Sequence, residues 1–349
     1  MRLTLRPIKR TPTPAHQPRR LLCLFTALLF IFPAALARAQ DYTSIVIFGD
    51  SLSDTGNVAH LTEATYRVRI PGPVADYTDG RFTDGDDTIP TAQRYFGVWI
   101  EQFAATLPAK PIIRNSLDGG TNYAYGFAFT GSGTALLTLT PSISVTINNI
   151  GQQITDYLAT APVISDRTLF VVWGGANDIL NATSADDVIK ASLEETKDIQ
   201  RLVDAGATQF IVPNLPPLGL IPRLNGSPTT SIPATTASIL YNQLLDAGLT
   251  ILREFNFGKR LRFLQLDVFS LFNKVVASPS SYSLANVTGS SQGASTIDPD
   301  TYLFWDDLHP TTKGHQILAQ TAARLLKRSH SDSVPAETEA ADIVVSNER

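Results

Sequence analysis

The sequence has a single cysteine, Cys23, and it lies in the N-terminal segment. The rest of the chain therefore has no thiol for a disulfide, a cysteine nucleophile or a cysteine metal ligand. Acidic residues are missing from residues 1–39, which carry seven of the 28 lysines and arginines. Without that segment the chain has 21 basic against 32 acidic residues, a net charge of −11, and no basic cluster. These absences exclude thiol chemistry and argue against a nucleic-acid-binding protein.

Residues 1–39 have the order of a secretory signal: a basic region, then the apolar run LLCLFTALLFIFPAALA, then the small residues ARA before Gln40. This order predicts a signal peptide with cleavage after Ala39, and hence a secreted protein, extracellular or periplasmic. A retained membrane anchor is the alternative, but the apolar run is short for a membrane span and Pro33 interrupts it. We expect no stable membrane span after cleavage.

The body of the chain alternates short apolar runs with segments of helical periodicity. Strands are predicted at 44–48, 111–114, 168–173, 208–212 and 262–268. Helices are predicted at 92–106, 184–205, 235–256 and 312–327, the clearest of them with a capping box of Ser184 and Asp187. Strands that alternate with helices indicate an α/β fold in which helices cover both faces of a parallel sheet. Residues 40–328 are expected to form one such domain, and the polar, acidic segment 329–349 to be disordered.

Ser51 stands where a predicted strand ends, in the stretch IVIFGDSLSDTGN. A serine at such a place is most often a turn residue or a helix N-cap, so its position alone does not make it a nucleophile. In parallel sheets, however, active groups gather at the carboxyl ends of the strands. Three other stretches carry polar residues in such places: GGAND with Asn177, the proline-rich loop at Asn214, and WDDLHPT with Asp306 and His309.

A serine nucleophile needs a base within hydrogen-bonding reach, and the base needs an acceptor that orients it. Few histidines qualify as the base. His60 lies in a polar loop nine residues after Ser51, and His315 falls within the predicted last helix, where an exposed surface role is expected. His309 is the candidate that is left, with a purely structural role as the alternative. Asp306 lies three residues before it, so a turn can bring the carboxylate to the imidazole.

Four blocks occur in one order along the chain: FGDSLSDTGN, GTNYAYG, GGAND and WDDLHPT. In sequence and order they resemble the GDSL-type esterases of the SGNH hydrolase family, over residues 44–327. The resemblance implies a three-layer α/β/α, flavodoxin-like fold with a central parallel sheet, and a serine esterase that works without a cofactor or metal. Carried over by residue, it implies Ser51 as nucleophile, Asp306 as the orienting carboxylate and His309 as the base.

The resemblance also implies an oxyanion hole made by the Ser51 amide, a glycine amide in NYAYG and the Asn177 side chain. Gly126 is the expected glycine, with Gly120 as the alternative. Phe127 departs from the family, because relatives often have a second small residue at this position. Such a hole stabilises the negative charge that develops during acyl transfer.

Two further features of the sequence have to be assigned a catalytic or a structural role. The stretch GSSQG at 289–293 matches a nucleophile elbow with Ser291 as its serine. That motif needs a strand before it and a helix after it, whereas a polar loop with neither is predicted here. Asp50 and Asp54 are expected to order the turn around Ser51 and to favour the start of a helix, with no catalytic role.

The absence of a long apolar lid argues against a triglyceride lipase and favours short acyl esters, including O-acetyl groups on carbohydrates. Phospholipid or lysophospholipid hydrolysis and acyl transfer are alternatives within the family, and a secreted binding module without turnover is the alternative outside it. Segments that line the cleft are expected at 75–87, which resembles the family's GRF-x-(D/N)-G segment, and at the aromatic positions of NYAYGFAF, which a buried strand also explains. The expected partner is a small-molecule or polysaccharide ester and not a nucleic acid; the sequence indicates no oligomeric state.

Overall fold

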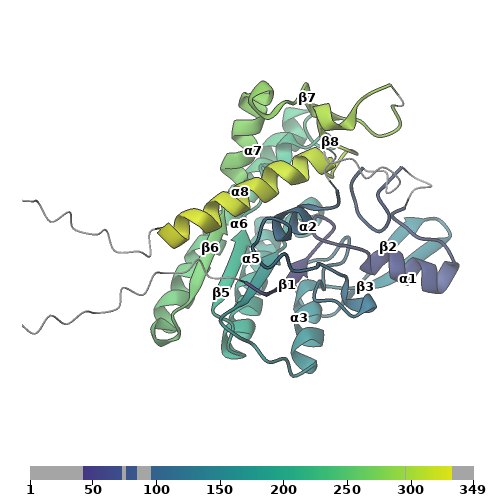
Figure 1. Cartoon of the computed structure of the whole chain (residues 1–349). Helices are drawn as coiled ribbons and strands as arrows, with labels where there is room; N and C mark the ends of the chain where they lie inside the picture. The colour runs from purple at the N-terminus through teal and green to yellow at the C-terminus, as the bar shows by residue number, and fades with distance from the viewer. Residues whose placement is uncertain (1–41, 73–75, 85–95, 295, 332–349) are drawn as a thin grey trace, which may run out of the picture. The chain divides into compact units, whose positions relative to one another are not determined.

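The computed structural model describes residues 42–72, 76–84, 96–294 and 296–331. Of residues 330 and 331 it describes only the backbone. Within these residues a parallel sheet of four strands forms the centre, in the order β1-β4-β5-β6 (Figure 1). Its strands are β1 (Ser44–Gly49), β4 (Thr168–Trp173), β5 (Gln209–Pro213) and β6 (Arg262–Leu266). The sequence predicted all four. The strand predicted at 111–114 is wrong: this described segment is irregular, and its Ile112 is 84% exposed.

Both faces of the central sheet are buried, because its strands are almost wholly apolar. Successive side chains along a strand point to opposite faces, so Val46 and Phe48 of β1 enter one core while Ile45 and Ile47 enter the other. Each such side chain contributes roughly 1.5–3 kcal/mol by its burial. Strands buried on both faces have continuous apolar sequences, which is why SIVIF and TLFVVW could be recognised as strands.

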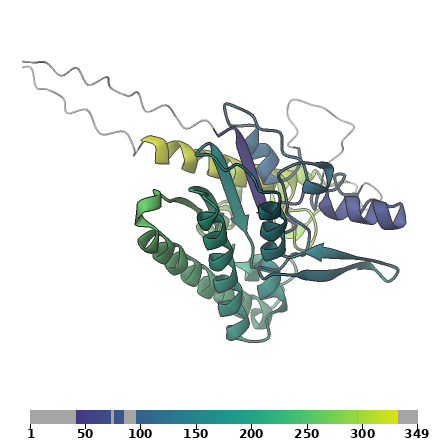
Figure 2. The same ribbon diagram turned by 90° about the horizontal axis from the view of Figure 1, so that it is seen from below.

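A layer of helices covers each face of the sheet (Figure 1, Figure 2). The helices of these layers are α2 (Trp99–Ala104), α3 (Ile150–Ala159), α5 (Ala185–Asp204), α6 (Pro228–Phe255) and α8 (Thr312–Ser331). On one face α3 packs against α5 and α5 against α6, and on the other face α2 packs against α8. This is the three-layer α/β/α arrangement that the family resemblance implies.

The predicted helices differ from the observed ones mainly at their ends. Helix α5 begins as predicted, because Ser184 and Asp187 form the expected capping box. Helix α2 has six residues, and residues 92–95 of the helix predicted there lie outside the described residues. Helix α8 runs to Ser331, so the first residues of the segment expected to be disordered are helical. Residues 332–349 lie outside the described residues.

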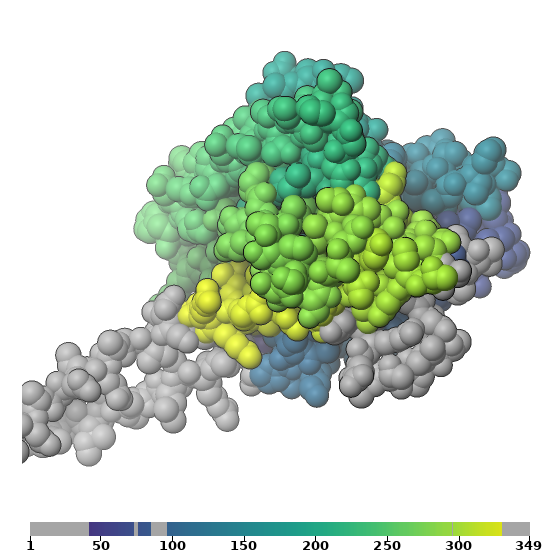
Figure 3. Space-filling model, turned by 90° about the horizontal axis from the view of Figure 1, so that it is seen from above, coloured from purple at the N-terminus to yellow at the C-terminus, as the bar shows by residue number. Residues whose placement is uncertain are grey.

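The sequence did not predict α3, and it did not predict a further set of elements. They are the helices α1 (Asn57–Tyr66), α4 (Ala176–Asn181) and α7 (Val268–Ala277), the strands β2 (Thr134–Thr140), β3 (Ile143–Asn148), β7 (Asn286–Ser290) and β8 (Tyr302–Phe304), and the 3-10 helices η2 (Ser116–Asp118), η3 (Leu218–Leu220), η4 (Phe257–Lys259), η5 (Pro279–Tyr282) and η6 (Pro299–Thr301). β2 and β3 form an antiparallel hairpin that lies beside α1 (Figure 2). The light-green to yellow segments, from α7 to α8, gather on the face shown in Figure 3.

No helix of the described residues is both long enough and apolar enough to cross a membrane. The predicted signal peptide at 1–39 lies outside the described residues.

Candidate active site

The polar residues singled out in three blocks of the sequence come together where the central strands end. Ser51 follows β1, Asn177 lies at the start of α4 after β4, and Asp306 and His309 lie in the loop between β8 and α8. Ser51, Asn177 and His309 line one cavity. Parallel strands with helices on both faces leave this edge open for a ligand, so the placement agrees with the position of active sites in such sheets.

Ser51, His309 and Asp306 form a chain of hydrogen bonds. Ser51 Oγ lies 2.9 Å from His309 Nε2, and His309 Nδ1 lies 2.6 Å from Asp306 Oδ2. All three residues are more than nine-tenths buried. Because a carboxylate can only accept, the proton of the neutral ring lies on Nδ1, and Nε2 presents its lone pair to the Ser51 hydroxyl. The arrangement can therefore draw the proton from Ser51.

The loop after β8 holds the Asp306 carboxylate in its charged form. Asp306 Oδ1 accepts hydrogen bonds from the amides of Leu308 at 2.7 Å and His309 at 2.6 Å. Burial raises the pKa of Asp306, but the His309 ring and the two amides outweigh burial and hold the pKa well below its usual range. The carboxylate is ionised at neutral pH and can stabilise a positive charge on the ring.

Tyr77 belongs to this series of hydrogen bonds, although no role was expected for it beyond its place in the cleft-lining segment 75–87. Its hydroxyl donates to Asp306 Oδ2 at 2.7 Å. The segment that carries Tyr77 is fixed to the start of α8, where Asp84 accepts from the Thr312 amide at 2.5 Å and from the Thr312 hydroxyl at 3.1 Å. The similarity of this segment to GRF-x-(D/N)-G was the only signal, and it pointed to the cleft without naming a tyrosine.

The structure contradicts the assignment of Gly126 to the oxyanion hole. Its amide donates to Asp54 Oδ2 at 2.9 Å, so its single hydrogen is already used. The alternative, Gly120, donates its amide to a backbone carbonyl at 2.9 Å. Gly126 is instead required for packing, because a Cβ there would lie 2.4 Å from the ring of Phe82. Phe82 in turn faces the His309 ring, with 5.2 Å between the ring centroids.

The amide after Gly126 is that of Phe127, and it has no hydrogen-bond acceptor among the described residues. Phe127 has φ 69°, in the left-handed region that suits small residues best, and it lines the cavity of Ser51. The Ser51 amide also lacks an acceptor within the described part of the chain. Asn177 Nδ2 donates one of its two hydrogens to the Ala128 carbonyl at 3.0 Å, which leaves the other for a ligand.

The stretch NYAYGFAF is not the buried strand that its alternating aromatic residues also allowed. It is irregular from Asn122 to Phe129, apart from isolated bridges of Asn122 with Ile47 of β1 and with Asn115. Tyr125 is buried in the core, whereas Phe127 lines the cavity. One aromatic side chain of this stretch is therefore placed to contact a ligand.

Asp50 and Asp54 have the structural role that the sequence indicated. Asp50 accepts from the Leu52 amide at 3.0 Å, which closes the turn around Ser51. Asp54 accepts from the amides of Gly56 and Asn57, both at 2.8 Å, and so caps the start of α1. Burial raises the pKa of each carboxyl to about 6.

A buried pair supports the turn that leads to Asn177. A Cβ at Gly175, where φ is 94°, would lie 2.3 Å from the ring of Tyr241, so this turn and the tyrosine are in close contact. The Tyr241 hydroxyl donates to the carboxyl group of Glu195 on α5. Burial raises the pKa of Glu195 to about 8, so this carboxyl is mostly neutral at pH 7.

Two other candidates of the sequence lie outside the cavity. Asn214 donates to Asp267 at 3.1 Å and accepts from the Phe269 amide at 2.9 Å, and so joins the end of β5 to the start of α7. Ser291 directly follows β7, so the expectation of a loop without a preceding strand is wrong; no helix follows it, however. Its hydroxyl donates to the Phe304 carbonyl at 3.2 Å, in a buried position.

His315 is buried and not on the outer face of the last helix, where the sequence placed it. The buried positions of α8 include His315, Leu318, Ala319 and Ala322, which have the spacing of one helix face. Burial, together with the nearby His309, lowers the pKa of His315 to about 3. The ring is therefore neutral at pH 7.

Residues 45–322 match the family of GDSL-like lipases and acylhydrolases. Curated relatives include a phosphatidylcholine-sterol acyltransferase of Aeromonas hydrophila, 24% identical over 88% of this chain and 97% of the relative. Another is an acetylesterase of Thermothelomyces thermophilus, 28% identical over 87% of this chain and 96% of the relative. An acetylxylan esterase from Geobacillus stearothermophilus is similar in structure at 12% identity, with a TM-score of 0.39 over 82% of this chain and 96% of that one. The chain belongs to the GDSL-like lipase/acylhydrolase family, the SGNH hydrolases, and is a carboxylic ester hydrolase of the GDSL type.

Proposed function

We propose that this chain hydrolyses carboxylic esters through an acyl-enzyme on Ser51. The observation that carries the proposal is the chain of hydrogen bonds from Asp306 through His309 to Ser51. It supplies what a serine nucleophile needs, a base in reach of the hydroxyl and a carboxylate that holds the base in its productive tautomer.

In the proposed reaction, Ser51 Oγ attacks the carbonyl carbon of the ester while His309 Nε2 takes the hydroxyl proton. The bond from that carbon to the alcohol oxygen then breaks, and His309 returns the proton to the leaving alcohol. Water attacks the acyl-enzyme in the same way, with His309 as its base, and the acid is released as Ser51 regains its proton. Asp306 keeps the ring oriented and stabilises its positive charge in both steps.

The proposed oxyanion hole consists of the amides of Ser51 and Phe127 and the Asn177 side chain. Its support is that each of these groups has a hydrogen without an acceptor among the described residues. Donors placed in advance at the developing negative charge stabilise the transition state more than the substrate, so each one contributes to the rate.

The alcohol half of the ester is proposed to occupy the cavity that contains Ser51. Its lining mixes polar side chains, such as those of Asn181 and Arg223, with aromatic side chains, such as that of Phe127. A hydroxylated alcohol suits this mixture, which supports esters of carbohydrates as substrates. Acyl transfer to an alcohol is the second candidate, favoured by the acyltransferase relative, and product analysis with added alcohols separates the two.

The order of segments at the N-terminus supports the further proposal that residues 1–39 are a signal peptide and that the catalytic domain, from Gln40 onward, is secreted. N-terminal sequencing of the protein recovered from the medium or periplasm tests this. A first residue at or near Gln40 is expected, and an exported protein that still carries residues 1–30 contradicts it.

The proposed activity is tested with a soluble p-nitrophenyl ester and a serine-directed phosphonate. The phosphonate is expected to label Ser51 and to abolish turnover, and Ser51→Ala is expected to lose both labelling and activity while it stays folded. Ser291→Ala is the matched control, because Ser291 is equally buried but bonds only a backbone carbonyl. Labelling of Ser291, or full turnover by Ser51→Ala, would overturn the proposal.

A further inference from the structure

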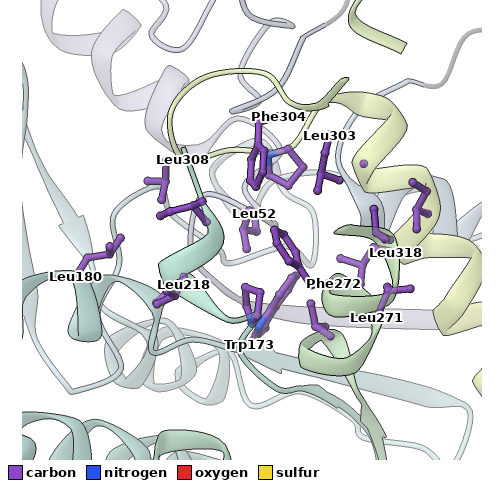
Figure 4. Close-up of a pocket in the computed structure, with 18 of the residues that line it drawn as sticks. Leu52, Trp173, Leu180, Leu218, Leu271, Phe272, Leu303, Phe304, Leu308 and Leu318 are labelled. Carbon is purple, nitrogen blue, oxygen red and sulfur yellow. The ribbon is translucent and has the colours of Figure 1, made fainter. Parts of the chain in front are cut away.

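A second cavity shares lining residues with the cavity that contains Ser51. Figure 4 shows the side chains around it. Its walls come from the end of β4 with Trp173, from η3 with Leu218, from α7 with Leu271 and Phe272, and from β8 with Phe304. Apart from Asn177 and the indole of Trp173, every side chain that lines it is hydrocarbon, and one lining residue is a glycine. The cavity is therefore almost wholly apolar.

Two chain neighbours of the catalytic groups are among the residues that line this cavity. Leu52 follows Ser51 in the chain and Leu308 precedes His309, and both line the apolar cavity (Figure 4). Asn177, Leu180 and Leu308 line this cavity and also the one that holds Ser51. The two cavities adjoin, and the one polar side chain that they share is the proposed oxyanion donor.

The cavity has room for a chain and not only for a methyl group. The space that the centre of a water-sized sphere can reach in it is about 80 Å³. A sphere that only just fits leaves its centre almost no room to move, so a cavity of this size holds more than one water-sized group. Protein interiors are otherwise close-packed, with few voids larger than a water molecule. An apolar space of this size next to the catalytic cavity is therefore suited to bind part of the substrate.

The chemistry of the lining determines which part of a substrate can bind in this cavity. A sugar ring or a charged headgroup would lose its hydrogen bonds to water here and would find Asn177 as almost its only partner, which is costly. An alkyl chain loses no hydrogen bonds and gains from leaving water. The polar portion of a substrate fits the neighbouring cavity, where Asn181 and Arg223 lie.

We propose that the apolar cavity binds the acyl chain of the substrate, and that the preferred substrates are esters of straight-chain acids of medium length rather than acetates. This inference rests on the proposed function, since the chain enters the cavity from the carbonyl carbon attacked by Ser51. It revises the sequence-based expectation of short acyl esters, because an acetyl group would leave the cavity empty. The reaction itself is unchanged: the acyl group passes to Ser51 and then to water, and the alcohol leaves.

A chain-length series of p-nitrophenyl esters, from acetate to dodecanoate, tests the inference on the unmodified protein. Because a buried methylene corresponds to about a fourfold gain in binding, kcat/KM is expected to rise severalfold per methylene until the cavity is filled, and to reach its maximum well beyond the acetate. A maximum at the acetate, or no change with chain length, would reject the acyl site and leave the proposed function intact. Failure to hydrolyse any ester, with no phosphonate label on Ser51, would instead reject the proposed function.

Two substitutions in α7 change the cavity in opposite directions. Val275→Phe adds a ring to the lining and is expected to lower the ratio of octanoate to acetate kcat/KM about tenfold or more, the loss of about two methylenes of chain. Leu271→Ala removes part of the lining and is expected to move the maximum to longer chains. Val276→Phe is the matched control, because the adjacent residue is partly buried in the same helix but does not line the cavity.

The ratio of two substrates within one preparation does not depend on the fraction of folded enzyme. If Val275→Phe fails to fold, the shift expected for Leu271→Ala still decides the question. Wild-type ratios and maxima in every folded variant, or equal changes in Val275→Phe and Val276→Phe, would show that this cavity does not hold the acyl chain.

Discussion

The Tyr77 hydroxyl donates a hydrogen bond to the Asp306 carboxylate at 2.7 Å, on the oxygen that also accepts from the His309 ring. Tyr77 and Asp306 are 229 residues apart in the sequence. Tyr77 touches neither Ser51 Oγ nor the reacting carbon in the proposed reaction, so its role is to position the carboxylate that orients the base.

Replacing Tyr77 by Phe should slow turnover without preventing substrate binding. A hydrogen bond to a charged group is worth about 1.5–3 kcal/mol, so kcat is expected to fall about tenfold or more, with little change in KM. The carboxylate also loses a competing donor and attracts the charged ring more strongly, so the acidic limb of the pH–rate profile should move to higher pH. Tyr66→Phe is the control, because the Tyr66 hydroxyl donates to the Ser144 carbonyl away from the site. If the acidic limb of the pH–rate profile does not move, the Tyr77 side chain contributes only packing and does not act on the Asp306 carboxylate.

The central residues of the site could be predicted because each lies in a short block at the end of a strand or beside the last helix. Ser51 and Asn177 follow strands whose apolar sequences are unmistakable, and Asp306 and His309 are three residues apart. These positions depend only on residues that are close together in the sequence, so they can be predicted from it. Tyr77 could not be found in the same way, because its partner is brought to it only by the folded segment that Asp84 fixes to α8.

Which amide of the turn at Gly126 and Phe127 points into the cleft depends on backbone geometry, which cannot be predicted from the sequence. Whether an amide points to the cleft or to Asp54 is decided by the dihedral angles of one turn, and Phe127 takes a left-handed conformation there. A phenylalanine is uncommon in this region of φ, so the only sign of it in the sequence was the small residue that relatives often have at this position. The apolar cavity was missed for a related reason: its walls come from five separate segments, and none of them is a lid.

Asp306→Asn should lower turnover by orders of magnitude. The side-chain oxygen of Asn can still accept from the amides of Leu308 and His309, but its nitrogen then faces two donors, the His309 ring and the Tyr77 hydroxyl. The ring must turn to the tautomer with its proton on Nε2, which cannot accept the Ser51 proton, and a loss on the order of 10⁴ in kcat is expected.

This effect is measured by the steady-state kinetics of Asp306→Asn, with Asp204→Asn as the control. Asp204 is in an exposed ion pair with Lys259, which is worth at most about 1 kcal/mol of stability and is remote from the cavity. Asp204→Asn should turn over substrate at the wild-type rate. Wild-type kcat in Asp306→Asn would show that His309 is oriented by another group.

Asn177→Ala should reduce kcat about 100- to 1,000-fold, because it removes a donor to the developing negative charge. The midpoint of the acidic limb should stay where it is in the wild type, since the base and its carboxylate are untouched. Asn214→Ala is the comparison: this asparagine also follows a central strand, but its partners are Asp267 and Phe269. Equal losses in the two variants would mean that Asn177 acts through the fold and not through the oxyanion.

His315 lies on the buried face of α8, and it controls stability in acid and not catalysis. Its spacing from Leu318, Ala319 and Ala322 was the signal in the sequence, which the polarity of histidine concealed. Within the described residues neither ring nitrogen has a hydrogen-bond partner. Its pKa is about 3 in the folded protein against an ordinary value of about 6.5, so between these pH values the unfolded chain binds more protons than the folded one. Because its ring is neutral in the folded protein, His315 destabilises the fold progressively as the pH falls from about 6.5 toward 3, and it has no such effect above about pH 6.5.

His315→Leu should therefore make the protein more resistant to acid. Leucine does not titrate and leaves no buried nitrogen without a partner, so at pH 7 the free energy of unfolding is expected to equal or exceed that of the wild type. At pH 4 the variant should be more stable than the wild type by about 1–3 kcal/mol, within the roughly 1.4 kcal/mol per pH unit that one group can contribute. Urea denaturation at pH 4 and pH 7 measures both quantities, and ester turnover at pH 7 should be retained. His60→Leu is the control, because His60 is exposed and pairs with Asp118 on the surface. If His315→Leu loses as much stability between pH 7 and pH 4 as the wild type does, His315 does not titrate on unfolding in this range, and its burial has no part in the acid sensitivity of the protein.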